Sequence, residues 1–198
     1  MTRLLVVCLI LVFTKAYPQK EIGEKPLPDI CLTQTELDLY NLINEYRAQK
    51  GLPEVKLSAS LSFVARTHAK DQTDNFKDGN RCNMHSWSNK GSWSSCCYTP
   101  DHSKSKCMWD KPRELTNYKS DGFEISFYST YPFSTDEALA KFILDGWKKS
   151  PSHNDVILNK KIWKDMKWLA IGIGVYGEYA NVWFGLAEDN SGEPLPCE

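Results

Sequence analysis

The chain lacks most of the features that would connect it with nucleic acid, with a lipid bilayer or with the common serine hydrolases. Beyond its first residues, no apolar run approaches the roughly 20 residues that a membrane-spanning helix needs. Lys and Arg total 24 against 25 Asp and Glu, and no block of like charge occurs, so we expect no nucleic-acid partner. The chain also has no Asn-x-Ser/Thr sequon and no Gly-x-Ser-x-Gly motif. These absences exclude N-glycosylation and the nucleophile elbow of the α/β-hydrolases.

The first sixteen residues have the organisation of a secretory signal peptide. Arg3 supplies a positive start, residues 4–13 are apolar without interruption, and Thr-Lys-Ala at 14–16 is a small-x-small cleavage site. We therefore predict a signal peptide over 1–16, a secreted, extracellular protein and no transmembrane segment. Loss of Arg3 and Lys15 leaves 22 basic against 25 acidic residues, a net charge of −3.

The cysteine count indicates a disulfide framework. One of the seven cysteines, Cys8, leaves with the signal peptide, and an even number in a secreted chain favours three disulfides. Six cysteines allow fifteen pairings, but the adjacent Cys96 and Cys97 should bond to different partners because a vicinal bridge strains the peptide between them. We expect the outermost pair, Cys31 and Cys197, to join, and the remaining four to staple the loop between them. A zinc site, either at the Cys-x-x-His sequence 82–85 or at Cys96-Cys97, is the competing interpretation, and an oxidising compartment disfavours it.

Capping residues and prolines mark the ends of the predicted helices. Residues 17–32 contain three prolines among charges and are expected to form an extended N-terminal arm. Residues 33–36 form a capping box that opens a helix, which Gly-Leu-Pro at 51–53 ends. Ser58 can cap a second helix that fades near 74–75. A second capping box at 134–137 opens a third helix, which Pro151 is expected to end.

The strand signals complete a mixed fold. Residues 123–128, 169–176 and 179–184 have strand patterns, with a turn at 177–178. Helices on both sides of such strands predict an α+β fold over 33–198, a three-layer α-β-α sandwich. Residues 76–122 have no periodicity but hold four of the six mature cysteines, so we expect a disulfide-pinned loop insert. This loop holds three tryptophans: Trp87, Trp93 and Trp109. At least two of them are best explained as part of a small core packed on the disulfides.

Three short motifs carry a family resemblance when read in chain order. They are His85 in Asn-Met-His-Ser-Trp, Glu124 in Gly-Phe-Glu-Ile and His153 in Trp-Lys-Lys-Ser-Pro-Ser-His-Asn-Asp-Val-Ile-Leu. With the glycine-rich ending, the region from about 35 to 186 resembles the CAP superfamily and its SCP domain: cysteine-rich secretory proteins, antigen 5 and plant pathogenesis-related 1 proteins. The resemblance implies an α-β-α sandwich and a cleft lined by two His and two acidic residues, which in several members binds a divalent metal such as zinc. His85, Glu124 and His153 match the two His and one Glu.

The chain departs from the family pattern at two places. The second acidic residue usually follows the tryptophan of the helix, but Lys148, Lys149 and Ser150 follow Trp147 here. Within the loop insert, residues 88–113, which include the double cysteine, have no counterpart that we can place in the family pattern.

The three matched residues permit more than one kind of site. Two neutral imidazoles and a carboxylate can hold zinc and leave one coordination position to water. Without metal the same groups can act as acid and base, or serve as hydrogen-bonded structural residues. The other two histidines are expected to be structural: His68 packed or half exposed on its helix, and His102 solvated in a Ser/Lys-rich loop.

The favoured functional class is a secreted binding or signalling module without enzymatic activity. From the resemblance, the cleft or an apolar groove is expected to receive a lipid, a sterol or a partner protein. The alternative is a secreted, protease-like hydrolase in which Ser86 or Ser152 works with a neighbouring histidine and Glu124 orients the ring. Sequence neighbours point in different directions, which disfavours that alternative. A purely structural matrix protein is a third possibility.

Overall fold

The computed structural model describes residue 25, residues 27–77 and residues 81–198. The predicted signal peptide over 1–16 and most of the predicted arm over 17–32 lie outside these residues. Where the arm is described, Lys25 contacts the insert: its backbone N–H donates to Asn117 Oδ1 (3.1 Å) and its ammonium to the carbonyl of Arg113 (2.9 Å). None of the helices in the described part combines the length and apolar character required to cross a bilayer.

The centre of the molecule is a four-stranded sheet in the order β2-β4-β5-β3. Its members are β2 (Lys56–Leu57), β3 (Gly122–Tyr128), β4 (Ala170–Tyr176) and β5 (Tyr179–Gly185). β2 runs parallel to β4, whereas β4-β5 and β5-β3 are antiparallel. Gly177, with φ of 56°, makes the tight turn between β4 and β5. The three predicted strands are therefore present to within one residue at each end.

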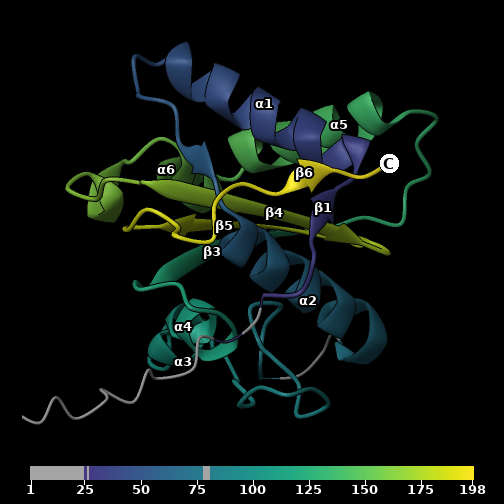
Figure 1. Cartoon of the computed structure of the whole chain (residues 1–198), viewed down its shortest axis with the longest axis vertical. Coiled ribbons are helices and arrows are strands. Elements are labelled where there is room, and N and C mark those ends of the chain that lie inside the picture. Colours follow the sequence, from purple (N-terminus) through teal and green to yellow (C-terminus); the bar gives the residue numbers. More distant parts are fainter. Residues whose placement is uncertain (1–24, 26, 78–80) are drawn as a thin grey trace, which may run out of the picture.

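Helices cover both faces of this sheet (Figure 1). α1 (Gln34–Ala48), α5 (Asp136–Lys149) and α6 (Pro151–Ile157) lie on one face, and α2 (Ala59–Asn75) lies on the other. The larger hydrophobic core fills the space on the α1–α5 side, where Leu39, Ile43 and Trp147 are buried. The predicted three-layer α-β-α sandwich is confirmed.

The helix starts follow the predicted caps in two of three cases. The Thr33–Glu36 capping box is present, with both reciprocal hydrogen bonds, and Ser58 Oγ accepts from Leu61 N (3.0 Å). The capping box expected at 134–137 is wrong by one residue. Thr135 is the N-cap and its hydroxyl accepts from Ala138 N (3.1 Å), so no glutamate occupies the third helical position.

Pro151 follows the end of α5 and also begins the next helix, α6. It occupies the first turn of α6, where its missing N–H has no helical partner to lose. This short helix, which carries His153, was not among the predicted elements.

Two glycines of β4 let α2 lie directly on the sheet. A Cβ at Gly172 would come within 2.1 Å of the Leu61 carbonyl carbon, and one at Gly174 within 2.1 Å of Arg66 N. Both contacts are with helix backbone, which cannot give way as a flexible side chain does. The close approach brings the side chains of α2 against β3 and β5.

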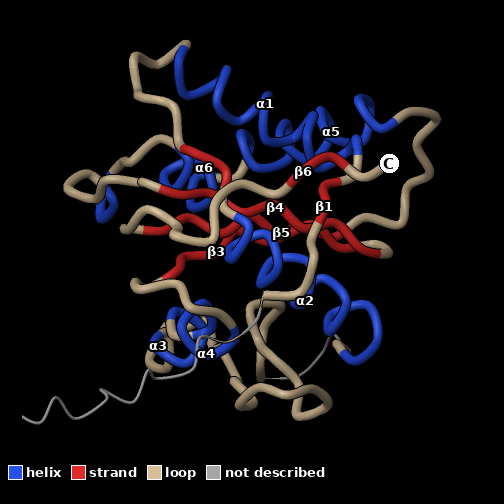
Figure 2. Tube along the Cα trace, in the orientation of Figure 1, coloured by secondary structure: helices blue, strands red, loops and turns tan. Residues whose placement is uncertain are grey.

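The insert lies below α2 and is mostly loop (Figure 2). It is not structureless: it contains α3 (Lys106–Trp109) and α4 (Lys111–Leu115), which are too short to give a periodic signal in the sequence. Trp87, Cys96 and Met108 are buried in a second hydrophobic cluster with Trp183 of the sheet, as expected for a small core on the disulfides.

The disulfides are Cys31–Cys197, Cys82–Cys97 and Cys96–Cys107. Both expectations are confirmed: the outermost cysteines pair, and the adjacent two bond to different partners. Beside the first bridge, β1 (Cys31–Leu32) pairs in parallel with β6 (Leu195–Pro196), which closes the ends of the domain. Because Cys82, Cys96 and Cys97 are all in disulfides, the zinc interpretations of the Cys-x-x-His sequence at 82–85 and of Cys96-Cys97 are both wrong.

Candidate functional site

A cleft of about 670 Å³ opens between the insert on one side and α6 with the following 3-10 helix, η1 (Lys161–Trp163), on the other. His85, Glu124 and His153 all line it, so the three residues predicted from sequence lie in one cavity. Most of the remaining wall is apolar and comes from four elements: Met108, Trp109, Phe123, Ile125, Val156, Ile162 and Trp163.

Glu124 holds the site together from the middle of β3. Its side chain is fully buried and its carboxylate lies between two imidazoles. Oε2 accepts from His68 Nδ1 (2.5 Å) and Oε1 accepts from His85 Nδ1 (2.8 Å). Burial by itself would raise the pKa of Glu124, but the charges and hydrogen bonds of His68 and His85 lower it to about 2. Glu124 is therefore an ionised carboxylate whose two oxygens are both engaged.

His68 of α2 is the functional residue that the sequence analysis did not assign. It is fully buried, in agreement with the packed alternative of the expectation, and its ring stacks on Trp87 with centroids 4.3 Å apart. Its Nε2 donates to the carbonyl of Ser86 (3.0 Å), so both ring nitrogens face acceptors. The available signal was its place on the buried face of the helix, where a histidine needs polar partners.

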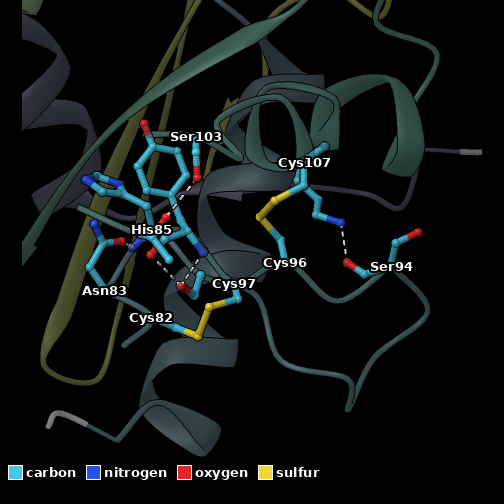
Figure 3. The surroundings of a disulfide bond; sticks show 12 residues. Cys82, Asn83, His85, Ser94, Cys96, Cys97, Ser103 and Cys107 are labelled. Carbon is cyan, nitrogen blue, oxygen red and sulfur yellow. Dashed lines mark hydrogen bonds between the residues drawn. A yellow bond between two sulfur atoms is a disulfide. The ribbon is translucent and has the colours of Figure 1, made fainter. Parts of the chain in front are cut away.

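His85 is positioned by the first residues of the insert. Figure 3 shows it beside the Cys82–Cys97 bridge and Asn83. The Asn83 side chain accepts from His85 N (3.0 Å), and Asn83 N donates to the carbonyl of Tyr98 (2.8 Å). His85 Nδ1 donates to Glu124 Oε1, and no described residue hydrogen-bonds to its Nε2. In a neutral ring this arrangement leaves the lone pair on Nε2.

His153 faces the cleft from the first turn of α6. Its ring is half-buried and has no hydrogen-bond partner among the described residues. Burial, and to a lesser extent the nearby His85, lower the pKa of His153 to about 4, and Glu124 partly opposes this shift. At neutral pH, His153 is therefore an uncharged imidazole that can donate or accept one hydrogen bond.

The remaining histidine also reaches the cleft. His102 is exposed, as expected, but its Nδ1 pairs with the Tyr98 hydroxyl (2.8 Å) at the wall of the cavity. Neither of the serines considered for catalysis has a hydroxyl group that hydrogen-bonds to a histidine side chain. Ser86 Oγ accepts from Tyr98 N (2.9 Å), and Ser152 Oγ lies 3.4 Å from Ser150 Oγ.

The family resemblance implies a metal, and the donor groups can be compared with what zinc requires. Glu124 already serves two imidazoles, and the other carboxylate of the cleft, Asp155, pairs with Lys161 (2.8 Å). No group of three or more His, Cys, Asp or Glu within the described ranges is placed to hold a metal ion. His85 Nε2 and His153 remain, one protein ligand short of a catalytic zinc site. The side chains in this arrangement do not fit a three-ligand site, and binding of zinc by the two imidazoles with water stays a prediction.

Fold and site together define a disulfide-stapled α-β-α sandwich with an apolar cleft built around an imidazole–carboxylate–imidazole cluster. The model of the CAP family, described as "Cysteine-rich secretory protein family", matches residues 40–186. The chain belongs to this family. The matched residues run from α1 through β5 and contain His85, Glu124 and His153.

Among the solved structures to which this chain is similar are three from bacteria. They include a cysteine-rich secretory protein from Staphylococcus aureus subsp. aureus Mu50 (19% identity, TM-score 0.49, 77% of this chain and 38% of that chain). An extracellular protein containing an SCP domain from Bacillus anthracis str. Ames has 18% identity, a TM-score of 0.49 and coverage of 77% and 40%. An outer surface protein from Borrelia burgdorferi has 18% identity, a TM-score of 0.48 and coverage of 77% and 94%. This chain thus spans about two fifths of the first two proteins. No curated protein matches it significantly.

Proposed function

We propose that the protein is a secreted, extracellular binding module whose cleft receives a hydrophobic small molecule of the lipid or sterol class. The observation that carries the proposal is the combination of a mostly apolar cavity with two imidazoles that can still bond to a ligand. His85 Nε2 and the ring of His153 have no hydrogen-bond partner among the described residues, whereas His85 Nδ1 is bonded to Glu124. The body of the ligand would pack on the apolar walls, and its one polar group would bond to the imidazoles.

The dimensions of the cleft suit this class of ligand. Small-molecule sites usually have volumes of about 300–1,000 Å³, mainly apolar walls and a few convergent polar groups. The cavity of about 670 Å³ lies within this range, and its apolar lining comes from both the insert and the sandwich. Burial of such walls by an apolar ligand supplies affinity in proportion to the area removed from water.

Glu124 has a positioning role in this proposal. Because the carboxylate accepts the hydrogen bond from His85 Nδ1, the neutral ring presents the lone pair of Nε2 to the cavity. A hydroxyl group of a sterol can donate to that nitrogen, whereas an apolar ligand without a polar group would leave it unpaired. The cluster therefore favours ligands with one hydrogen-bonding end.

The non-enzymatic assignment is part of the proposal. It is supported by the hydrogen bonds of Ser86 and Ser152, which go to backbone and to another serine, whereas a nucleophile needs its base within about 2.6–3.2 Å. The disulfide framework supports the extracellular location, because such bridges persist in oxidising compartments.

The test is a binding titration with two fluorescent probes, dehydroergosterol and a fatty acid with a conjugated polyene chain. We expect saturable binding of at least one probe. Val156→Trp, which fills the cleft, should abolish that binding, and Leu195→Trp on the exposed strand β6 should leave it unchanged. Melting temperatures of both variants check that each is folded. Binding that survives Val156→Trp in the folded protein would place the ligand elsewhere.

A further inference from the structure

One side of the entrance to the cleft is formed by a short segment rich in lysine. After α6 the chain forms a lip over residues 160–167, which we call the basic lip. Lys161, Ile162 and Trp163 of this segment also line the cavity, so the lip is part of the entrance. Whatever covers the lip also faces the opening of the cleft.

An apolar side chain projects from the basic lip into solvent. Ile162 is 79% exposed, the largest value among the exposed large hydrophobic residues of the described chain. Trp163 and Met166 next to it are half-buried. A side chain this exposed contributes little to folding, because it gains almost no burial there.

The backbone holds this projection in place. Asn159 and Lys161 have positive φ values of 49° and 50°, unusual for residues other than glycine. The buried guanidinium of Arg47 donates to Asn159 Oδ1 (2.9 Å) and to the carbonyl of Ile157 (2.5 Å). Asn159 Nδ2 in turn donates to the carbonyl of Met166 (3.1 Å). Strained conformations that the surroundings hold in place are typical of functional segments.

The charge of the lip contrasts with that of the chain. Four lysines and one aspartate give residues 160–167 a charge of +3, whereas the whole chain has −1. Lys161 is paired with Asp155, but no described residue makes an ion pair with the exposed lysines at three positions: Lys160, Lys164 and Lys167. The opposite side of the entrance is closer to neutral: Lys104 is exposed beside His102, and Lys106 pairs with Asp110 (2.9 Å).

We propose that the basic lip docks on an anionic lipid surface, with its lysines at the headgroups and Ile162 inserted among them. Clustered lysines are attracted to such surfaces, and stable docking needs an apolar contribution as well. The mouth of the cleft then faces the bilayer, so an apolar ligand can pass between bilayer and cavity without crossing water. That second step rests on the proposed function, whereas the docking itself does not.

The experiment is co-sedimentation of the disulfide-bonded protein with vesicles of phosphatidylcholine alone or mixed with phosphatidylserine. We expect binding to the mixed vesicles only, and weaker binding as salt screens the charges. The triple variant Lys160→Glu/Lys164→Glu/Lys167→Glu should bind at least about a hundredfold more weakly. Ile162→Ser should reduce binding by about tenfold.

A matched control separates the lip from net charge. Lys50→Glu/Lys90→Glu/Lys119→Glu makes the same charge change at exposed positions that do not line the cleft, and it should retain binding to within a few-fold. Equal losses in the two triple variants, or no binding of the wild-type protein to phosphatidylserine vesicles, would overturn the proposal. Binding to poly-glutamate but not to vesicles would also overturn it, in favour of an acidic protein partner.

Probe binding in solution distinguishes this proposal from the proposed function. The triple variant of the lip should still bind dehydroergosterol, since its three lysines do not line the cavity. If the wild-type protein docks on mixed vesicles but binds neither fluorescent probe, docking is supported and the proposed function fails.

Discussion

The sandwich and the insert reach defined structures by different physical means. In the sandwich, regular strands and helices bury residues such as Leu39, Ile43 and Trp147 in one large core. The insert over 81–121 has little regular structure and depends on two disulfides that close loops with sequence separations of only 15 and 11 residues. The cleft is built from one wall of each kind, so its shape requires both.

Polar contacts attach the insert to the sandwich. Asp71 of α2 is buried and accepts from Ser88 N (2.7 Å) and Ser88 Oγ (2.5 Å). Within the insert, the buried ammonium of Lys111 pairs with Glu114 (2.5 Å) and lies 5.4 Å from the centre of the Trp87 ring. Buried charges of this kind have to be paired, so they define the position of a loop more strictly than apolar contacts do.

The largest difference between the regions should come from their disulfides. Cys31→Ser/Cys197→Ser opens a bridge with a sequence separation of 166 residues and should lower the free energy of unfolding by about 5 kcal/mol, on chain-entropy grounds. Cys96→Ser/Cys107→Ser should lower it by about 3 kcal/mol, because its loop is short. Urea unfolding of the two variants measures both values. A larger loss for the insert variant would contradict the comparison.

Core tryptophans should show the next largest contrast. Trp147→Ala removes a side chain that is 1% exposed from the sandwich and should cost about 3–5 kcal/mol of global stability. Trp93→Ala in the insert removes a half-buried ring, and we expect about 1 kcal/mol with faster hydrogen exchange confined to the insert. Exchange that accelerates throughout the sheet in Trp93→Ala would show that the regions unfold together.

Glu124 of the sandwich hydrogen-bonds to His85 of the insert, so acid should weaken the contact between the two regions. Its pKa is about 2 in the folded protein against a reference of 4.5, so its stabilising contribution is complete above about pH 4.5 and is lost as pH falls toward 2. We expect a loss of about 3 kcal/mol over this window. In Glu124→Gln, the pH dependence between 4.5 and 2 should flatten, measured by urea unfolding at several pH values. An unchanged slope in the variant would assign the acid sensitivity to other carboxylates.

His153, on the sandwich side, should give a smaller effect at higher pH. Its folded pKa of about 4 lies below the reference of 6.5, so the unfolded chain binds the proton first and stability falls as pH drops from 6.5 to 4. We expect about 1–2 kcal/mol, since the ring keeps some contact with solvent. His153→Gln should remove this slope and leave the one below pH 4.5 in place. The two variants thus separate the two sides of the cleft by pH.

Zinc should have the smallest effect of all. With Glu124 committed to two imidazoles, we expect weak binding through His85 and His153, and weaker still in acid, where protons compete with the metal for the two rings. Calorimetric titration of the wild-type protein and of His153→Ala tests this. Tight binding that survives His153→Ala would place the metal at another site.

The sequence predicted the elements that repeat a pattern and missed those that depend on distant partners. Strands over 123–128, 169–176 and 179–184 alternate or form apolar runs, so they were predictable to within one residue. His68 was not assigned because its partner Glu124 is 56 residues away and no local pattern connects the two. The third helix start was displaced because Ser134 and Thr135 are both good caps, and the path of the preceding loop decides between them.

The stacking of His68 on Trp87 has an optical consequence. The indole of Trp87 is buried, its Nε1 has no hydrogen-bond partner, and its ring lies parallel to an imidazole from the other region of the molecule. Any movement of the insert away from α2 would separate these rings and let water reach the indole. The emission of Trp87, isolated by replacing the other tryptophans with phenylalanine, would then report in real time and without a dye whether the wall of the cleft is docked or displaced.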